Sequence, residues 1–290
     1  MSKRNLATID TDIGQEWSRI IQDAFADGID CDLITEGGLE TTGSAQAIMS
    51  VSATQNYAIG TRRAHDGKVF RYAKSATGAA LVAGNVIQSA SLGGGSTSSE
   101  YDMTIATAST AGSNFAYATL KSTGATAALV NAYKDGYYIV SDGTATQGVG
   151  QIKKILSHPK ATGQVSIKFT FTTPLEVAVD TAAKAAIVKN LYDDVIQAPV
   201  TSGTGVTAGV APVAVPVATP YFWLQTWGLC PMLINDALTA GTMVVRDISA
   251  AGAGSIGSTG ATALAAEKIG RTGWVTDTTD NGFVYLIVAP

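Results

Sequence analysis

The stretch that decides the fold is Pro220-Tyr-Phe-Trp-Leu-Gln-Thr-Trp-Gly-Leu-Cys-Pro231, the densest aromatic segment of the chain. Bulky rings favour strands because they pack well on a pleated surface, whereas proline cannot donate to a strand ladder. We therefore predict a strand within this stretch, bounded by its two prolines. A side-chain period of two places Tyr221, Trp223 and Trp227 on one face and Phe222 on the other.

Both faces of this predicted strand are largely apolar, so we expect it to be covered on both sides. One interpretation is a central core strand of a single domain. The other is that a neighbouring subunit covers one face, since interfaces are enriched in tyrosine and tryptophan. The sequence leaves both interpretations open.

The chain has 290 residues and little charge: 14% of its residues are Asp, Glu, Lys or Arg, against about 25% in ordinary globular proteins. Small residues dominate, including 31 glycines. This composition is unusual for a free metabolic enzyme and suits a structural protein whose surface is covered by partners. The net charge of −4 supports neither nucleic-acid binding nor attraction to an anionic membrane.

Cysteine spacing and the lack of long apolar runs bear on where the chain is made. Cys31 and Cys230 lie far apart, which favours two free thiols made in a reducing cytoplasm. Asp10, Asp12 and Glu16 interrupt any apolar run of a signal peptide. No window reaches the ~18 apolar residues of a membrane span.

Residues 12–28 predict an amphipathic helix. Asp12 can cap its start and Gly28 can end it. One apolar stripe recurs at helical spacing: Trp17, Ile20, Ile21, Ala24 and Phe25. A single helix cannot bury such a stripe alone. It therefore docks either on its own body or, as part of an arm, on a neighbour.

Elsewhere the pattern is that of short strands. Asp66-Gly67 between two apolar runs predicts a hairpin, and strict alternation from Val165 to Phe171 predicts a half-buried strand. The expected fold is mainly β. Its expected parts are an N-terminal helix and extended arm (1–56), a central antiparallel β domain (57–198), a Pro/Gly/Ala linker (199–219), and a small C-terminal barrel or sandwich of five short strands (220–290).

Residues that often carry chemistry are isolated here. His65 lies beside a turn with no catalytic partner nearby, so we expect an exposed turn residue. His158 lies in a turn and has no Cys, Asp or Glu at metal-ligand spacing. A short helix is possible between residues 180 and 196, which would leave Asp193 and Asp194 at a solvated helix end with their side chains pointing apart.

A glycoside hydrolase would need two carboxylates at a defined separation. Asp102, Glu176 and Asp180 are available, but turns explain each of them as well. We therefore expect no enzyme, no catalytic residues, no cofactor and no metal site.

Three segments together resemble structural proteins of tailed bacteriophages, particularly those of aquatic phages and viral metagenomes. They are Ile59-Gly-Thr-Arg-Arg-Ala-His-Asp-Gly-Lys-Val-Phe-Arg-Tyr-Ala-Lys; Tyr133-Lys-Asp-Gly-Tyr leading to Gly148-Val-Gly-Gln-Ile-Lys-Lys-Ile; and Tyr221-Phe-Trp-Leu-Gln-Thr-Trp-Gly with Ile269-Gly270. The similarity lies in turns and aromatic residues, and no catalytic residue is carried over.

The resemblance implies a capsid decoration (cement) protein on the virion surface, made in the host cytoplasm. Its implied partners are the major capsid protein and further copies of itself, as a homotrimer. The alternative is a tail or fibre adhesin whose aromatic face holds a host receptor or glycan. We expect interface contacts from the helical stripe and the aromatic residues: Trp17, Ile21, Phe25, Tyr221, Trp223, Trp227 and Trp274.

Overall fold

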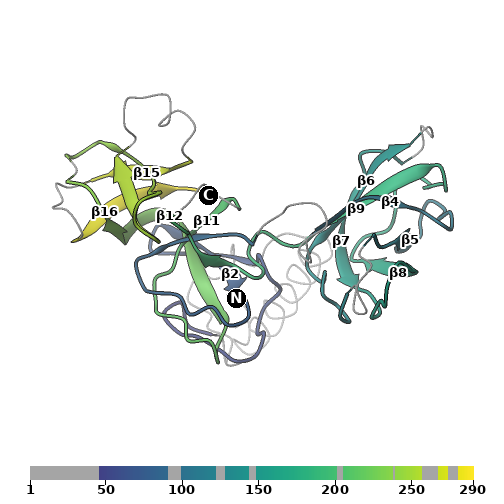
Figure 1. The fold of residues 1–290 in the computed structure, drawn as a ribbon, viewed down its shortest axis with the longest axis horizontal. Coiled ribbons are helices and arrows are strands. Elements are labelled where there is room, and N and C mark those ends of the chain that lie inside the picture. Colours follow the sequence, from purple (N-terminus) through teal and green to yellow (C-terminus); the bar gives the residue numbers. More distant parts are fainter. Residues whose placement is uncertain are drawn as a thin grey trace, which may run out of the picture.

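The computed structural model describes residues 46–90, 99–121, 128–143, 148–200, 205–237, 239–256, 267–273 and 280–290. Within these ranges every regular element is a β-strand, which confirms a mainly β fold. The strands form two separate bodies (Figure 1). The predicted helix over 12–28, and the arm as far as residue 45, lie outside the described residues.

The larger body is a ten-stranded sheet. Its strands are β1 (Arg62–His65), β2 (Lys68–Lys74), β3 (Val86–Gln88), β10 (Ile196–Gln197), β11 (Thr207–Val210), β12 (Tyr221–Ile234), β13 (Met243–Arg246), β14 (Gly254–Ile256), β15 (Lys268–Thr272) and β16 (Asp280–Ile287). Within this sheet β12, β14, β13, β15 and β16 pair in a closed circuit. These five strands are part of the larger sheet, because β12 also pairs with β2 and β11.

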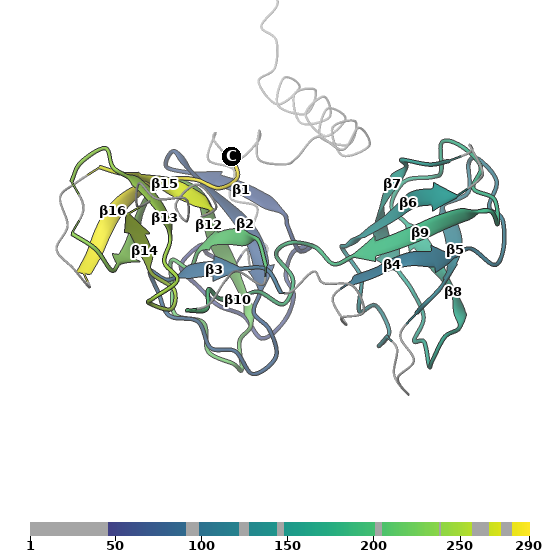
Figure 2. The same cartoon turned by 45° about the horizontal axis from the view of Figure 1, so that its top comes forward.

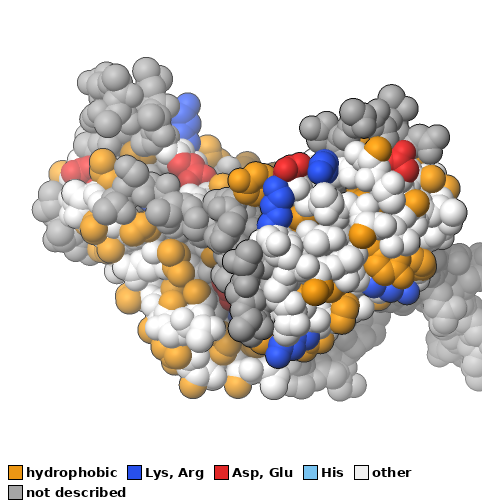
Figure 3. Space-filling view, turned by 45° about the vertical axis from the view of Figure 1, so that its right-hand side comes forward, with side chains coloured by type: hydrophobic (Ala, Val, Ile, Leu, Met, Phe, Trp, Pro, Cys, Tyr) orange, Lys and Arg blue, Asp and Glu red, His pale blue; other side chains and the backbone are white. Residues whose placement is uncertain are grey.

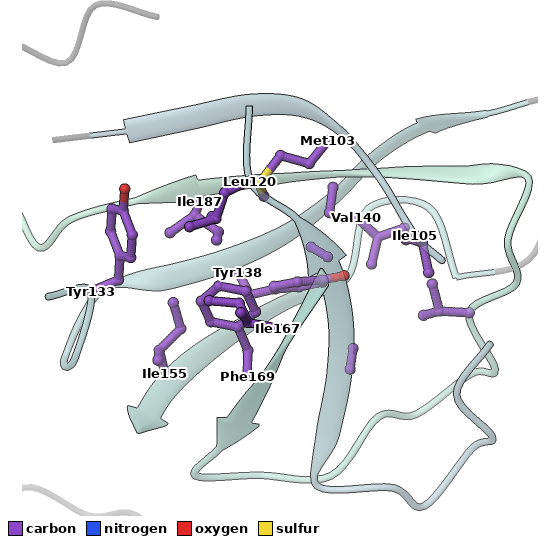
Figure 4. Close-up of a cluster of buried hydrophobic side chains, with 14 of the residues drawn as sticks. Met103, Ile105, Leu120, Tyr133, Tyr138, Val140, Ile155, Ile167, Phe169 and Ile187 are labelled. Atoms are coloured by element: carbon purple, nitrogen blue, oxygen red, sulfur yellow. The ribbon is translucent and has the colours of Figure 1, made fainter. Parts of the chain in front are cut away.

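The second body is a closed antiparallel barrel with the strand order β4-β5-β8-β7-β6-β9. Its strands are β4 (Ser99–Thr104), β5 (Phe115–Thr119), β6 (Tyr137–Gly143), β7 (Ile152–Ser157), β8 (Ser166–Phe171) and β9 (Ala183–Val188). Figure 4 shows part of its core, with Tyr138 and Phe169 close together. The ring centre of Tyr138 lies 5.8 Å from that of Phe169 and 5.2 Å from that of Phe171. Closure leaves this barrel without an exposed sheet edge.

The barrel is inserted between β3 and β10 of the larger sheet, so strand pairing divides the chain differently from the predicted 57–198 and 220–290 parts. β2, expected in the central domain, pairs with β12 along the register from Tyr221↔Lys74 to Trp227↔Val69. Phe70 and Tyr72 of β2 are buried, and the strand that pairs with them, β12, lies about 150 residues further along the chain. Local patterning identifies such a strand but not its partner.

The predicted linker over 199–219 contains a core strand, which corrects that part of the expectation. All four residues of β11 are buried between β3 and β12. A Cβ on Gly209 would lie 2.3 Å from the backbone oxygen of Gln225. Glycine and alanine here serve close strand packing rather than a flexible connection.

β12 also runs past the predicted limit at Pro231 and ends at Ile234. Pro231 is paired with Phe283 of β16. Two residues later, where the N–H points the same way, Leu233 donates to the carbonyl of Gly84, on the side away from β16. The missing N–H of Pro231 therefore costs no bond to β16, and the strand continues through the proline.

Figure 2 shows the place where the barrel joins the sheet. Polar contacts hold the two bodies together there. The carboxylate of Asp135, in the turn before β6, accepts from the amide side chain of Gln55 and the N–H of Ile59. The amide of Asn190, just after β9, donates to the carbonyls of Ile59 and Asp135. These contacts are buried or partly buried, so they fix the barrel's seat more firmly than exposed ones would.

Candidate functional site: an exposed apolar sheet face

A bulge in β12 creates the most distinctive surface of the described chain. The register with β2 shifts between Gln225 and Trp227, and Gly228 has φ of 86°. A Cβ on Gly228 would lie 2.8 Å from the carbonyl oxygen of Gly67. The bulge therefore needs glycine, and it turns the strand so that different side chains face the core beyond it.

Before the bulge β12 is buried on both faces; beyond it the strand alternates. Cys230, Met232 and Ile234 point into the core, whereas Trp227 (37% exposed) and Leu229 (39%) point outward. Burial raises the pKa of the Cys230 thiol to about 12, so this cysteine stays an inert core residue.

β16 continues the same surface. Val284 and Leu286 are buried, whereas Phe283 (50% exposed), Tyr285 (53%) and Ile287 (46%) face outward. The strand register sets them opposite the outward residues of β12 in three pairs: Trp227–Ile287, Leu229–Tyr285 and Pro231–Phe283. We call these six side chains the apolar face.

A cavity of about 360 Å³ adjoins the apolar face and shares Leu229 and Pro231 with it. Met49, Phe70 and Lys68 also line it. The cavity is small among ligand pockets, which commonly span about 300–1,000 Å³. Its walls are mainly hydrocarbon, so it suits an apolar side chain better than a polar ligand.

Two basic side chains flank the apolar face. Lys68 lies at the cavity, and Arg271 of β15 is directly opposite Tyr285 in the register. Figure 3 shows that charged side chains are scattered on one view of the molecule. A face with an apolar centre and a charged rim has the anatomy of a protein-binding surface.

The predicted interface residues have different fates. Trp223 is 1% exposed and lies in the core, Tyr221 is half-buried, and Trp227 belongs to the apolar face. Trp17, Ile21, Phe25 and Trp274 lie outside the described residues. The half of the stretch before the bulge is core, and the half beyond it is exposed surface. Cover by a neighbouring subunit stays a prediction.

Sequence reasoning missed Leu229, Pro231, Phe283, Tyr285 and Ile287. In residues 283–288 both sets of alternate positions are apolar. Alternation could therefore not show which face points outward. The one available signal was the Trp-Gly pair at 227–228, a common bulge composition.

Asp193 and Asp194 were predicted at a solvated helix end, and this was wrong. Residues 183–188 form strand β9, and Asp193 is buried beyond it. Lys74 Nζ lies 3.4 Å from Asp193 and 3.0 Å from Asp194, and Lys189 also pairs with Asp194. The spacing of Ala183 and Ile187 fits a strand as well as a helix, because four is a multiple of the strand period.

Burial and the neighbouring charges shift the pKa values of the two aspartates in opposite directions. Burial and the charge of Asp194 raise the pKa of Asp193, against the opposing effect of the two lysines. Burial also opposes ionisation of Asp194, but hydrogen bonds and charge from Lys189 and Lys74 outweigh it and lower its pKa. The lysines and carboxylates satisfy one another, which marks a structural ion-pair network at the seat of the barrel.

The other carboxylates have local structural partners. Asp102 pairs with Lys121, and Glu176 accepts from Lys153 at 2.6 Å. Asp180 accepts from the N–H groups of residues 182 and 183.

His158 is buried, and its hydrogen bonds fit a neutral imidazole. Its Nε2 accepts from the N–H of Tyr133, and its Nδ1 lies 2.8 Å from the carbonyl oxygen of Pro159. This pattern requires the tautomer protonated on Nδ1. Burial lowers its pKa, with the Pro159 contact opposing. His65 is exposed, and its Nε2 lies 3.2 Å from the carboxylate of the neighbouring Asp66.

Two searches of the described residues were negative. No three side chains of His, Cys, Asp or Glu come close enough together to hold a metal ion. No described helix has the length and apolar character needed to cross a membrane.

Comparison of the chain with protein-family models, curated proteins and solved structures finds no match in any of the three. The chain is therefore described by its fold and its surface. The chain is a two-body β protein whose larger body presents an apolar sheet face with a basic rim.

Proposed function

We propose that this chain is a virion structural protein that attaches to neighbouring proteins of a capsid shell, and to copies of itself, through the apolar face. The observation that carries the proposal is the alignment of six outward apolar side chains on β12 and β16. The resemblance to phage structural proteins supplies the biological setting, that of a decoration protein on the outer surface.

The energetics of such a surface suit assembly. An outward tryptophan and an outward tyrosine are the side chains most often found at binding hot spots. Trp227 and Tyr285 lie on adjacent strands of the same face, within a set of smaller contacts. On a lattice, each copy binds at several points, so modest single contacts add up through avidity.

A tail or fibre adhesin remains the second candidate. The cavity of about 360 Å³ beside Leu229 is the observation that favours it, because it could receive one apolar group of a receptor. Its open, largely hydrocarbon wall suits a sugar less well, since glycan recognition relies on polar groups placed for several hydroxyls.

Location on the particle tests the proposal first. Immunogold electron microscopy of purified virions, with antibody to this chain, should label the whole capsid surface. Labelling confined to the tail tip would favour the adhesin, and unlabelled particles would exclude both.

The role of the apolar face is tested by Tyr285→Asp, with Tyr101→Asp as its matched control. Tyr101 is 58% exposed on the barrel strand β4, close to the 53% of Tyr285. The first substitution should abolish attachment to shells and self-association in sedimentation experiments, because it puts a charge at the centre of the contact. Equal losses in both variants would contradict a role for this face.

A further inference from the structure

We infer that the cavity beside the apolar face binds an apolar amino acid whose nitrogen is acylated and whose carboxylate is free. Such a group exists as a small molecule and as the last residue of a polypeptide. The inference goes beyond the attachment proposed above, because it assigns a ligand to the cavity and not a partner to the apolar face. Its test uses the free protein and needs no virion.

The volume and the walls of the cavity set the size and polarity of the ligand. A volume of about 360 Å³ holds about a dozen non-hydrogen atoms at about 30 Å³ each, the share of a water molecule in the liquid. Different parts of the chain supply its apolar walls: Met49, Phe70, Pro212, Leu229 and Pro231. Covering these walls with an aliphatic side chain is favourable in proportion to the apolar area that leaves water.

Strand pairing brings two polar side chains to the same cavity. Gln225 of β12 is the register partner of Phe70 of β2, and Lys68 lies two residues before Phe70. Cross-strand partners point to the same side of a sheet, as do residues two apart on one strand. The ammonium group of Lys68 and the amide of Gln225 therefore belong to the side on which the cavity lies.

Lys68 makes the cavity selective for an anion. No other residue that lines it in the described part of the chain is ionisable, and the Lys68 ammonium has no ion-pair partner among the described residues. Burial raises the pKa of the Cys230 thiol and the charge of Lys68 opposes this, which places the ammonium towards β12. A cation beside hydrocarbon walls favours a carboxylate over a neutral group of the same shape.

Gln225 offers a hydrogen-bond acceptor to the ligand. It is 3% exposed, and its amide nitrogen donates to the carbonyls of Trp227 and Leu229. These two bonds fix which end of the amide is the nitrogen. Its Oε1 accepts no hydrogen bond within the described chain, so an N–H of the ligand can satisfy it.

An acylated apolar amino acid matches these three features together. Its side chain covers the walls, its carboxylate pairs with Lys68, and its amide N–H donates to Oε1 of Gln225. A free amino acid fits less well, because its own ammonium would repel that of Lys68. A plain fatty acid provides no donor for Gln225.

Binding is measured on the whole chain by NMR, with the methionine methyl groups labelled with carbon-13. N-acetylleucine should shift the signal of Met49, which lines the cavity, and leave that of Met103, in the barrel core, unchanged. The expected dissociation constant is in the low millimolar range, typical of a ligand of about a dozen non-hydrogen atoms. A Met49 signal that stays in place at about ten times that concentration would overturn the inference.

N-acetylleucinamide is the matched ligand, since it keeps the side chain and the amide N–H but has no charge. It should bind at least about threefold more weakly, and Lys68→Gln should remove the difference between the two ligands. Lys160→Gln is the control, because Lys160 is exposed on the barrel and also has no ion-pair partner among the described residues. Equal binding of both ligands to the wild-type chain, or a difference that survives in Lys68→Gln, would overturn the inference.

An N-acetylated pentapeptide that ends in leucine distinguishes the two sources of the ligand. Tighter binding of this peptide than of N-acetylleucine would identify the last residue of a polypeptide as the ligand, and equal or weaker binding would identify a small molecule. In either case the peptide with an amidated end should bind more weakly than the free acid. Equal binding of the two peptides would contradict recognition of the carboxylate.

Discussion

Replacing Trp223 by alanine separates the two halves of the aromatic strand β12. The indole of Trp223 is 1% exposed. Its ring centre lies 5.1 Å from those of Tyr57 and Tyr72, and its N–H donates to the carbonyl of Gln46. The guanidinium of Arg63 lies 5.7 Å from the ring centre. Trp223→Ala removes all of these contacts inside one chain.

The expected loss in unfolding free energy is large. A buried tryptophan replaced by alanine costs about 3–5 kcal/mol through lost burial and the cavity left behind. The lost hydrogen bond adds at most about 1 kcal/mol, because the Gln46 carbonyl keeps its bond from Arg63. We expect about 4 kcal/mol in total. In a body of this size that lowers the melting temperature by roughly 10 °C.

Scanning calorimetry measures the effect, because the barrel serves as an internal control. The barrel core shares no residue with the cluster around Trp223, so only the transition of the larger body should move. Trp227→Ala, at the exposed position, should leave both transitions within about 1 kcal/mol and instead weaken self-association by about 2 kcal/mol. An unmoved melting transition with lost assembly in Trp223→Ala would refute the assignment of this residue to the core.

Three further outcomes follow from particular contacts. Gly228→Ala should destabilise the larger body by about 1–3 kcal/mol in denaturant unfolding. The reason is that φ is 86° and the added Cβ would lie 2.8 Å from a carbonyl oxygen. An unchanged unfolding free energy would contradict the need for glycine at this bulge. The lowered pKa of His158 means that the unfolded chain takes up a proton first. Barrel stability should therefore be intact above about pH 6.5 and fall below it, and His158→Gln should flatten that dependence in melts between about pH 5 and 7.5. Asp135→Ala should loosen the contact between the barrel and the larger sheet, and so enlarge the radius of gyration in small-angle scattering. An unchanged radius would show that Asp135 does not hold the two bodies together.

Much of the local structure could be predicted. The Asp66-Gly67 hairpin is present as β1 and β2, and both turn residues have positive φ. The alternating run to Phe171 is β8. These elements follow from period and turn chemistry within about ten residues, information that any contiguous stretch carries by itself.

Predictions that depended on neighbours distant in the sequence were incomplete or wrong. Which side chains of β16 are exposed depends on the side on which the core lies. β11 resembled a linker because its small residues have no apolar–polar alternation, and only its pairing with β3 and β12 identifies it as a core strand. Asp193 and Asp194 were predicted to be solvated because their partner Lys74 lies more than a hundred residues earlier in the chain.

The sequence alone therefore determined the class of fold, the hairpin turns and the low charge of this protein, because each is set by residue type and short-range spacing. Tertiary structure alone decided the insertion of the barrel, the division of β12 into a buried and an exposed half, and the apolar face. Each of these depends on long-range pairing, and a one-residue bulge at Gly228 changes which side chains beyond it meet the core.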